Sequence, residues 1–268
     1  MKKKLTMCLS IALIVVMAIC GTLAYLTSED GDVNVMTLGG VEIDQIEKER
    51  TEQSDENTSA DNVQDFTQNK PLYPAVYDEI TWADGGYQEW PTGGSNQLFN
   101  DDIANVQDKA VFIENTGKSD AYVRTWFAFE AGDMTVDEID NGLIHWNRNT
   151  DHWHWTDFSD DMTAEIDGVK YYLRVATYTG NAGEDKEVHV NGVLPMEETT
   201  RPSLLQIFFG KEVTNEDIEA FGDTYEILAF SQAIQTEGFE DPIVALNTGF
   251  GEAIAANHPW ADTNEETH

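Results

Sequence analysis

Histidine residues concentrate in one short stretch of this 268-residue chain. Residues 151–155 read Asp-His-Trp-His-Trp, and His145 lies shortly before them. If the stretch is a strand, His152 and His154 project from one face, roughly 7 Å apart, and the two tryptophans from the other. Imidazole and carboxylate groups are zinc ligands, so His145, His152 and His154 could hold a metal ion together with a neighbouring aspartate.

The simpler interpretation is a strand with aromatic packing on one face and solvated histidines on the other. The H-E-x-x-H pattern of zinc peptidases is absent from the sequence. Acidic clusters at 30–34, 101–102 and 160–161 lack the spacing of an EF-hand loop, and a solvated acidic face is the simpler explanation for them. We therefore expect no catalytic residue and no cofactor, with weak binding of Ca²⁺ or Zn²⁺ as the alternative.

The elements that must position these residues are mostly strands. Residues 121–130 alternate so that Val123, Phe127 and Phe129 share one face. Similar strands are predicted at 110–114, 169–179, 204–209 and 225–234. The turn-forming residues 115–120 suggest that the strands on either side of them are antiparallel neighbours. Helices are predicted at 215–222 and, from an Asp241-Pro242 start, to about Phe250 before Gly251.

Strands about ten residues apart with few helices predict a mainly β fold. We expect a jelly-roll-like antiparallel β-sandwich with two or three short helices, following a cleaved signal peptide. The expected division is a signal peptide at 1–24, an N-terminal strand segment at 25–46, an acidic flexible linker at 47–65, the β-sandwich domain at 66–256 and a disordered tail at 257–268.

The charge balance excludes nucleic acid as a partner. The chain has 50 acidic and 15 basic residues, a formal net charge of −35, whereas phosphate contacts need a basic face. At 41% hydrophobic residues it still has enough apolar material for a core.

The N-terminus has the features of a secretory signal. Three lysines precede an apolar run that ends at Cys20, and the small residues Thr22 and Ala24 suit cleavage before Tyr25. Removing three lysines would change the net charge from −35 to −38. Both cysteines would be lost, which leaves no thiol for catalysis or zinc binding. Acylation at Cys20 is a competing interpretation, although Ile19 stands where such signals need a small residue. A second competing interpretation is that the N-terminal segment is an uncleaved anchor.

Several motifs carry a family resemblance. They are Gly-Thr-Leu-Ala-Tyr-Leu-Thr-Ser at 21–28, Asn-Val-Met-Thr-Leu-Gly at 34–39, Val-Glu-Ile at 41–43, Val-Phe-Ile-Glu-Asn-Thr-Gly at 111–117, Ala-Tyr-Val-Arg at 121–124 and the stretch 227–238. In these the chain resembles the TasA, CalY and camelysin family of secreted bacterial proteins, which are processed by the SipW type of signal peptidase.

The resemblance implies a jelly-roll domain secreted to the extracellular matrix or cell surface of a Gram-positive type of bacterium. A dedicated signal peptidase would be one partner, and the membrane would be met only during export. Some relatives form biofilm matrix fibres in which an N-terminal strand completes the sheet of a neighbour. Here Met36, Leu38, Val41 and Ile43 would be the donor-strand anchors. Alternatively, the same strand folds back into its own domain.

The sequence therefore predicts a secreted structural protein whose partners are further copies of itself or related matrix subunits. Two other functions stay open. One is a camelysin-like metal-dependent endopeptidase that uses the histidines. The other is an adhesin or carbohydrate-binding module, because the aromatic-rich stretch between Trp82 and Trp90 could stack on sugar rings.

Overall fold

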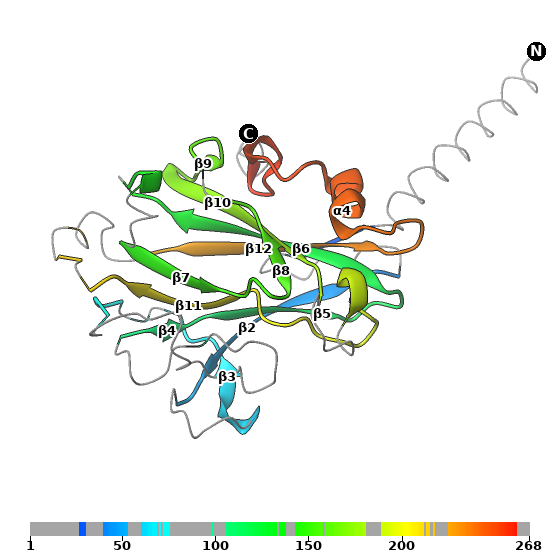
Figure 1. Cartoon of the computed structure of the whole chain (residues 1–268), viewed down its shortest axis with the longest axis horizontal. Helices are drawn as coiled ribbons and strands as arrows, with labels where there is room; N and C mark the ends of the chain where they lie inside the picture. The colour runs from blue at the N-terminus through cyan, green and yellow to red at the C-terminus, as the bar shows by residue number, and fades with distance from the viewer. Residues whose placement is uncertain are drawn as a thin grey trace, which may run out of the picture.

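The strands form two layers, with helix α4 beside one of them (Figure 1). The computed structural model describes residues 27–30, 40–52, 60–68, 70, 72–75, 98, 105–132, 134–137, 143–157, 159–180, 189–211, 213–214, 217 and 225–261. The expected signal peptide with Thr22, Ala24 and Tyr25, and the expected donor residues Met36 and Leu38, lie outside these ranges.

The first layer is an antiparallel sheet in the order β1-β12-β6-β10-β8, with β9 pairing with β10 beside β8. Its strands are β1 (Thr27–Asp30), β12 (Ile227–Gln235), β6 (Ala121–Glu130), β10 (Val169–Tyr178), β8 (Trp153–Trp155) and β9 (Thr163–Ile166).

The second layer combines two three-stranded antiparallel sheets, β4-β11-β7 and β3-β2-β5. Their strands are β4 (Gln107–Asp108), β11 (Leu204–Phe209), β7 (Ile144–Arg148), β3 (Val63–Asp65), β2 (Ile43–Arg50) and β5 (Ala110–Asn115). Backbone hydrogen bonds join the sheets, because Lys109 N donates to Leu205 O and Ser203 N to Val111 O, both at 2.8 Å. The prediction of a mainly β, antiparallel sandwich is confirmed.

The alternation in β6 determines how the layers pack. Val123, Phe127 and Phe129 are fully buried in the main core, with side chains from both layers. Trp126 belongs instead to a second cluster on the outer face of the first layer. A polar contact crosses the main core. Ser231 Oγ of β12 donates to Gln45 Oε1 of β2 at 2.7 Å and lies 3.0 Å from Thr125 Oγ1 of β6.

Helix α4 (Pro242–Phe250) covers part of the outer face of the first layer and confirms the predicted second helix. The Asp241 carboxylate accepts a hydrogen bond from Val244 N at 2.9 Å, as an N-cap residue does, and Gly251 ends the helix with φ of +83°. The described ranges also contain short 3₁₀ helices, which are η1 (Ala60–Asn62), η2 (Val190–Gly192) and η3 (Ala255–Asn257). Most of the helix expected at 215–222 falls outside the described residues.

The turn at 115–120 corrects one expectation. Strands β5 and β6 on either side of it are not paired, because β5 bonds to β2 and β6 bonds to β10 and β12. The turn therefore leads from one layer to the other. The Asn115 side chain supports this crossing by donating to Ser119 O at 2.9 Å and to Leu194 O at 3.0 Å.

Two further expectations need correction. Part of the expected linker at 47–65 is regular structure, since β2 continues to Arg50 and η1 and β3 occupy residues 60–65. The expected disordered tail at 257–268 includes described residues, and Trp260 packs edge-on against Phe230 with 6.4 Å between ring centroids. In the described part of the chain, no helix is both long and apolar enough to cross a membrane.

Candidate functional site

Strand β1 lies at the edge of the first layer and is joined to it by its pairing with β12. Thr27 to Asp30 pair in antiparallel register with Ile234 to Ser231. A strand at a sheet edge adds a row of backbone hydrogen bonds, and a strand of identical sequence from another copy would make the same row. The first four residues that the structure describes thus occupy a position that permits exchange.

The two described donor-strand candidates have a different environment. Val41 is 1% exposed and Ile43 3% exposed, and both contribute to the main core of their own chain beside Val111 and Ile113. Ile43 also starts β2 and pairs with Asn115 of β5. The structure therefore places Val41 and Ile43 in the core of their own chain, as the alternative in which the strand folds back into its own domain describes.

A close backbone contact fixes the chain just before β2. Lys118 N donates to Gly40 O at 2.5 Å, and Gly40 has φ of +61°, a conformation that favours glycine. A Cβ atom at Gly117 would lie 2.5 Å from Gly40 O and 2.6 Å from Glu42 N. Only glycine at 117 allows this approach, so the chain is held against the turn at residue 40.

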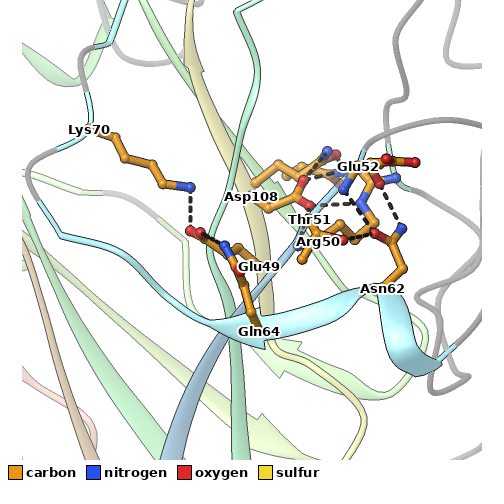
Figure 2. Close-up of polar contacts among 10 residues, drawn as sticks. Glu49, Arg50, Thr51, Glu52, Asn62, Gln64, Lys70 and Asp108 are labelled. Atoms are coloured by element: carbon orange, nitrogen blue, oxygen red, sulfur yellow. Dashed lines mark hydrogen bonds and ion pairs between the residues drawn. The ribbon is translucent and has the colours of Figure 1, made fainter.

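Beyond the core residues, β2 ends in a buried ion pair (Figure 2). Arg50 donates through Nε to Asp108 Oδ2 at 2.7 Å and through Nη2 to Asp108 Oδ1 at 2.9 Å. Gln206 Nε2 donates to the same Asp108 Oδ1 at 2.9 Å. The two charged side chains are 0% and 1% exposed, so this bidentate pair links β2, β4 and β11 away from water.

A second group of contacts holds β3 against β2. Glu49 forms an ion pair with Lys70 and accepts hydrogen bonds from Gln64 Nε2 at 2.8 Å and Thr67 N at 3.1 Å (Figure 2). Burial raises the pKa of Glu49, but the hydrogen bonds from Lys70, Gln64 and Thr67 outweigh it and hold that pKa below its usual value. These contacts were not predicted, because in the sequence their residues look like the solvated charges of a linker.

The three predicted metal ligands come from strand β7, strand β8 and the segment just before β8. His145 of β7 stacks on Phe208 of β11 with ring centroids 4.7 Å apart. His154 of β8 is exposed, with Trp153 and Trp155 buried on either side of it in the strand. His152 precedes β8, and its Nδ1 lies 3.2 Å from Asn149 Oδ1. Among the residues that the structure describes, no three His, Cys, Asp or Glu side chains are grouped closely enough to hold a metal ion. The metal site stays a prediction.

The structure brings His152 near a residue that sequence reasoning did not select, His189. The His189 ring lies 2.8 Å from the Tyr178 hydroxyl, and both histidines are close enough to Arg201 for its charge to act on them. Burial is the main cause that lowers the pKa of each histidine, and Arg201 adds to it. Asp151 beside His152 and Glu198 beside His189 act in the opposite direction. No sequence motif links positions 152 and 189.

These shifts predict that acid weakens the fold. A histidine whose pKa is lower in the folded chain stabilises it above the unfolded value of about 6.5, and this stability is lost as the pH falls toward the folded pKa. Thermal unfolding of the wild type and of His152→Gln/His189→Gln should therefore differ in pH dependence between about pH 7.5 and 5.5, with the variant losing less stability. Glu130, whose pKa is raised by burial and by Glu226, is present in both proteins and cancels in the comparison. Parallel profiles would contradict the prediction.

The other sequence candidates give less information. Trp82, Trp90 and Asp101–Asp102 lie outside the described residues, whereas Asp160 and Asp161 are exposed. No family model matches this chain, and neither a curated protein nor a solved structure does.

Proposed function

We propose that this chain is a secreted structural protein of the bacterial cell surface or extracellular matrix, and that copies of it associate by exchange of the N-terminal strand. The observation that carries the proposal is the pairing of β1 with the edge of β12, because β1 ends at Asp30, before the fixed point at Gly40. A strand that its own sheet accepts at an edge is a strand that the same edge of another copy can accept.

The contacts of β2 limit which residues can be exchanged. Val41, Ile43 and the Arg50–Asp108 pair are buried in the chain's own domain, so β2 stays where it is. The exchanged strand is β1, and Val41 and Ile43 are excluded from the exchange. Residues 31–39, which include Met36 and Leu38, would connect the exchanged strand to its own domain. When each copy donates its segment to one neighbour and accepts a segment from another, the contact is head-to-tail and extends into a filament.

The net charge bears on the conditions for assembly. At −35 for the whole chain, repulsion between copies is strong at low ionic strength and is screened by salt. Filaments should therefore be favoured by added salt or by calcium.

The test compares a chain that begins at Tyr25 with one that begins at Gly39. We expect the longer chain to form species larger than a monomer in sedimentation velocity and filaments in negative-stain microscopy as salt rises. The shorter chain lacks β1 but keeps Gly40, Val41 and Ile43, so it should fold and stay monomeric. Filaments from the shorter chain would refute the proposal, as would a longer chain that is monomeric under every condition.

A matched pair of variants separates backbone pairing from side-chain effects. Ser28→Pro/Glu29→Pro removes two backbone donors from β1, whereas Ser28→Ala/Glu29→Ala keeps them. Only the proline variant should lose assembly.

The endopeptidase and sugar-binding alternatives stay predictions. Chelator-sensitive proteolysis by the pure protein would favour the former, and glycan retention that depends on Trp82 or Trp90 the latter.

A further inference from the structure

A cleft of about 500 Å³ opens where strands β7, β8 and β10 meet. Strand β8 is the last strand of the first layer, and β7 is the last strand of its sheet in the second layer, so the cleft lies at one open side of the sandwich. Its lining residues are Arg148, Thr150, Trp153, His154, Trp155, Asp157 and Arg174. The volume is in the range of sites that bind small ligands or one to two sugar rings.

Two arginines of this cleft lie near the same tryptophan. The guanidinium carbons of Arg148 and Arg174 each lie 5.7 Å from the centre of the Trp155 ring. The ring itself is held firmly, because Trp155 Nε1 donates to Asn149 O at 3.0 Å and the ring stacks on Phe127 at 5.1 Å. Arg174 is 4% exposed and donates through Nε to Thr156 O at 2.5 Å. Both cations are therefore positioned by the fold.

Two of the chain's few arginines line this cleft, together with one acidic residue, Asp157. The sequence has only five arginines among 15 basic residues, against 50 acidic residues, and two of the five line this one cleft. Guanidinium groups are the preferred protein partners of carboxylates, which they can bind through two hydrogen bonds at once. The cleft is thus suited to a ligand that carries a carboxylate.

The remaining lining residues indicate what else the ligand carries. Trp153 is 2% and Trp155 8% exposed, so their faces are covered, and stacking of a neutral sugar on them is not the mode of binding. Thr150, His154 and Asp157 are exposed at the cleft and offer hydrogen-bond donors and acceptors that match hydroxyl groups. An acidic peptide would bring a carboxylate but no such hydroxyls, and Asp157 would repel its further charges.

We propose that this cleft binds a uronic acid, either free or as a unit of an acidic polysaccharide. The carboxylate binds at Arg148, next to the charge of the buried Arg174, and the ring hydroxyls face Asp157, Thr150 and His154. This binding is independent of the N-terminal strand, because none of the lining residues belongs to β1, β2 or β12.

Calorimetric titration of the chain that begins at Tyr25, at low ionic strength, tests the proposal with four probes. They are galacturonate, its trimer, the methyl-esterified trimer and a glutamate hexapeptide. We expect both uronates to bind and the ester to bind at least tenfold more weakly, because esterification removes the charge and keeps the sugar. A trimer that binds more tightly than the monomer identifies a polymer ligand, whereas equal binding identifies a single residue as the unit recognised, and both support the site.

Variants connect the binding to the cleft. Arg148→Gln should weaken uronate binding at least tenfold, whereas Lys118→Gln, which removes an exposed cation elsewhere, should leave it unchanged. Arg174→Lys, which keeps the charge at a buried position, should weaken it less than Arg148→Gln. No binding at millimolar uronate would overturn the proposal. Equal affinity for the ester or the peptide, or an unchanged affinity in Arg148→Gln, would do the same.

Discussion

Asp108→Ala is expected to lower the free energy of unfolding by about 3–5 kcal/mol, because it leaves the Arg50 guanidinium buried without its carboxylate. Both side chains are at most 1% exposed, and Asp108 also accepts from Arg50 N at 3.1 Å and from Gln206. Urea unfolding followed by tryptophan fluorescence measures the change. The melting temperature should fall by roughly 10 °C.

The control is Asp65→Ala, which removes the partner of Lys48, a residue of the same strand as Arg50. Asp65 has a side chain that is 91% exposed, so its loss should change stability little. If the two variants were equally stable, the buried pair would not be what holds β2 to β4 and β11.

Ile43→Ala is expected to cost about 2–5 kcal/mol, since it opens a cavity between the two layers. The matched control is Ile243→Ala on helix α4, where the same residue type is 38% exposed. Ile43 is 3% exposed, so the two substitutions remove the same atoms from different environments. Chemical denaturation of both variants checks the difference.

The burial of Val41 and Ile43 determines how far the chain can be shortened from its N-terminus. A chain that begins at Gln45 loses both core residues and the start of β2, and we expect it to be unfolded or aggregated. A chain that begins at Gly39 keeps them and should unfold cooperatively. Loss of filaments in the first chain would therefore say nothing about strand exchange, whereas loss in the second would.

The sequence predicted most strands well because their periodicity is local. β6 and β11 have the bounds expected from alternation, and the cap residues Asp241 and Gly251 correctly bracketed α4. Pairing is not local, and this is why the turn at 115–120 was misread. A turn of this composition suits a hairpin and a crossing between layers equally, and only contacts distant in sequence, such as that of Asn115 with Leu194, distinguish them.

The charged stretch after residue 46 was misread for a different reason. Its low apolar content suggested that burial would not offset the entropy lost when this stretch becomes ordered. Its charged side chains, however, have partners that are distant in the sequence. Lys109 Nζ contacts Glu47 Oε2 at 2.5 Å, and Asp108 pairs with Arg50. Similarly, nothing in the spacing of the histidines indicated that His152 would lie near His189, and nothing in the sequence indicated that Arg148 and Arg174 would lie near the same tryptophan.

The contact between the Thr125 and Ser231 hydroxyls and the Gln45 amide has a consequence for the spacing of subunits in a filament. It is a polar group of three within an apolar core, so a shift of β12 by one residue would replace Ser231 by Phe230 or Gln232 and leave the Gln45 amide without the Ser231 hydroxyl. Strand β12 is thereby held in a single register. Ser231 is also the residue that faces Asp30 across the β1–β12 pair. Any strand that docks on this edge meets donors and acceptors at fixed positions, and successive subunits of a filament would therefore be spaced at one constant interval.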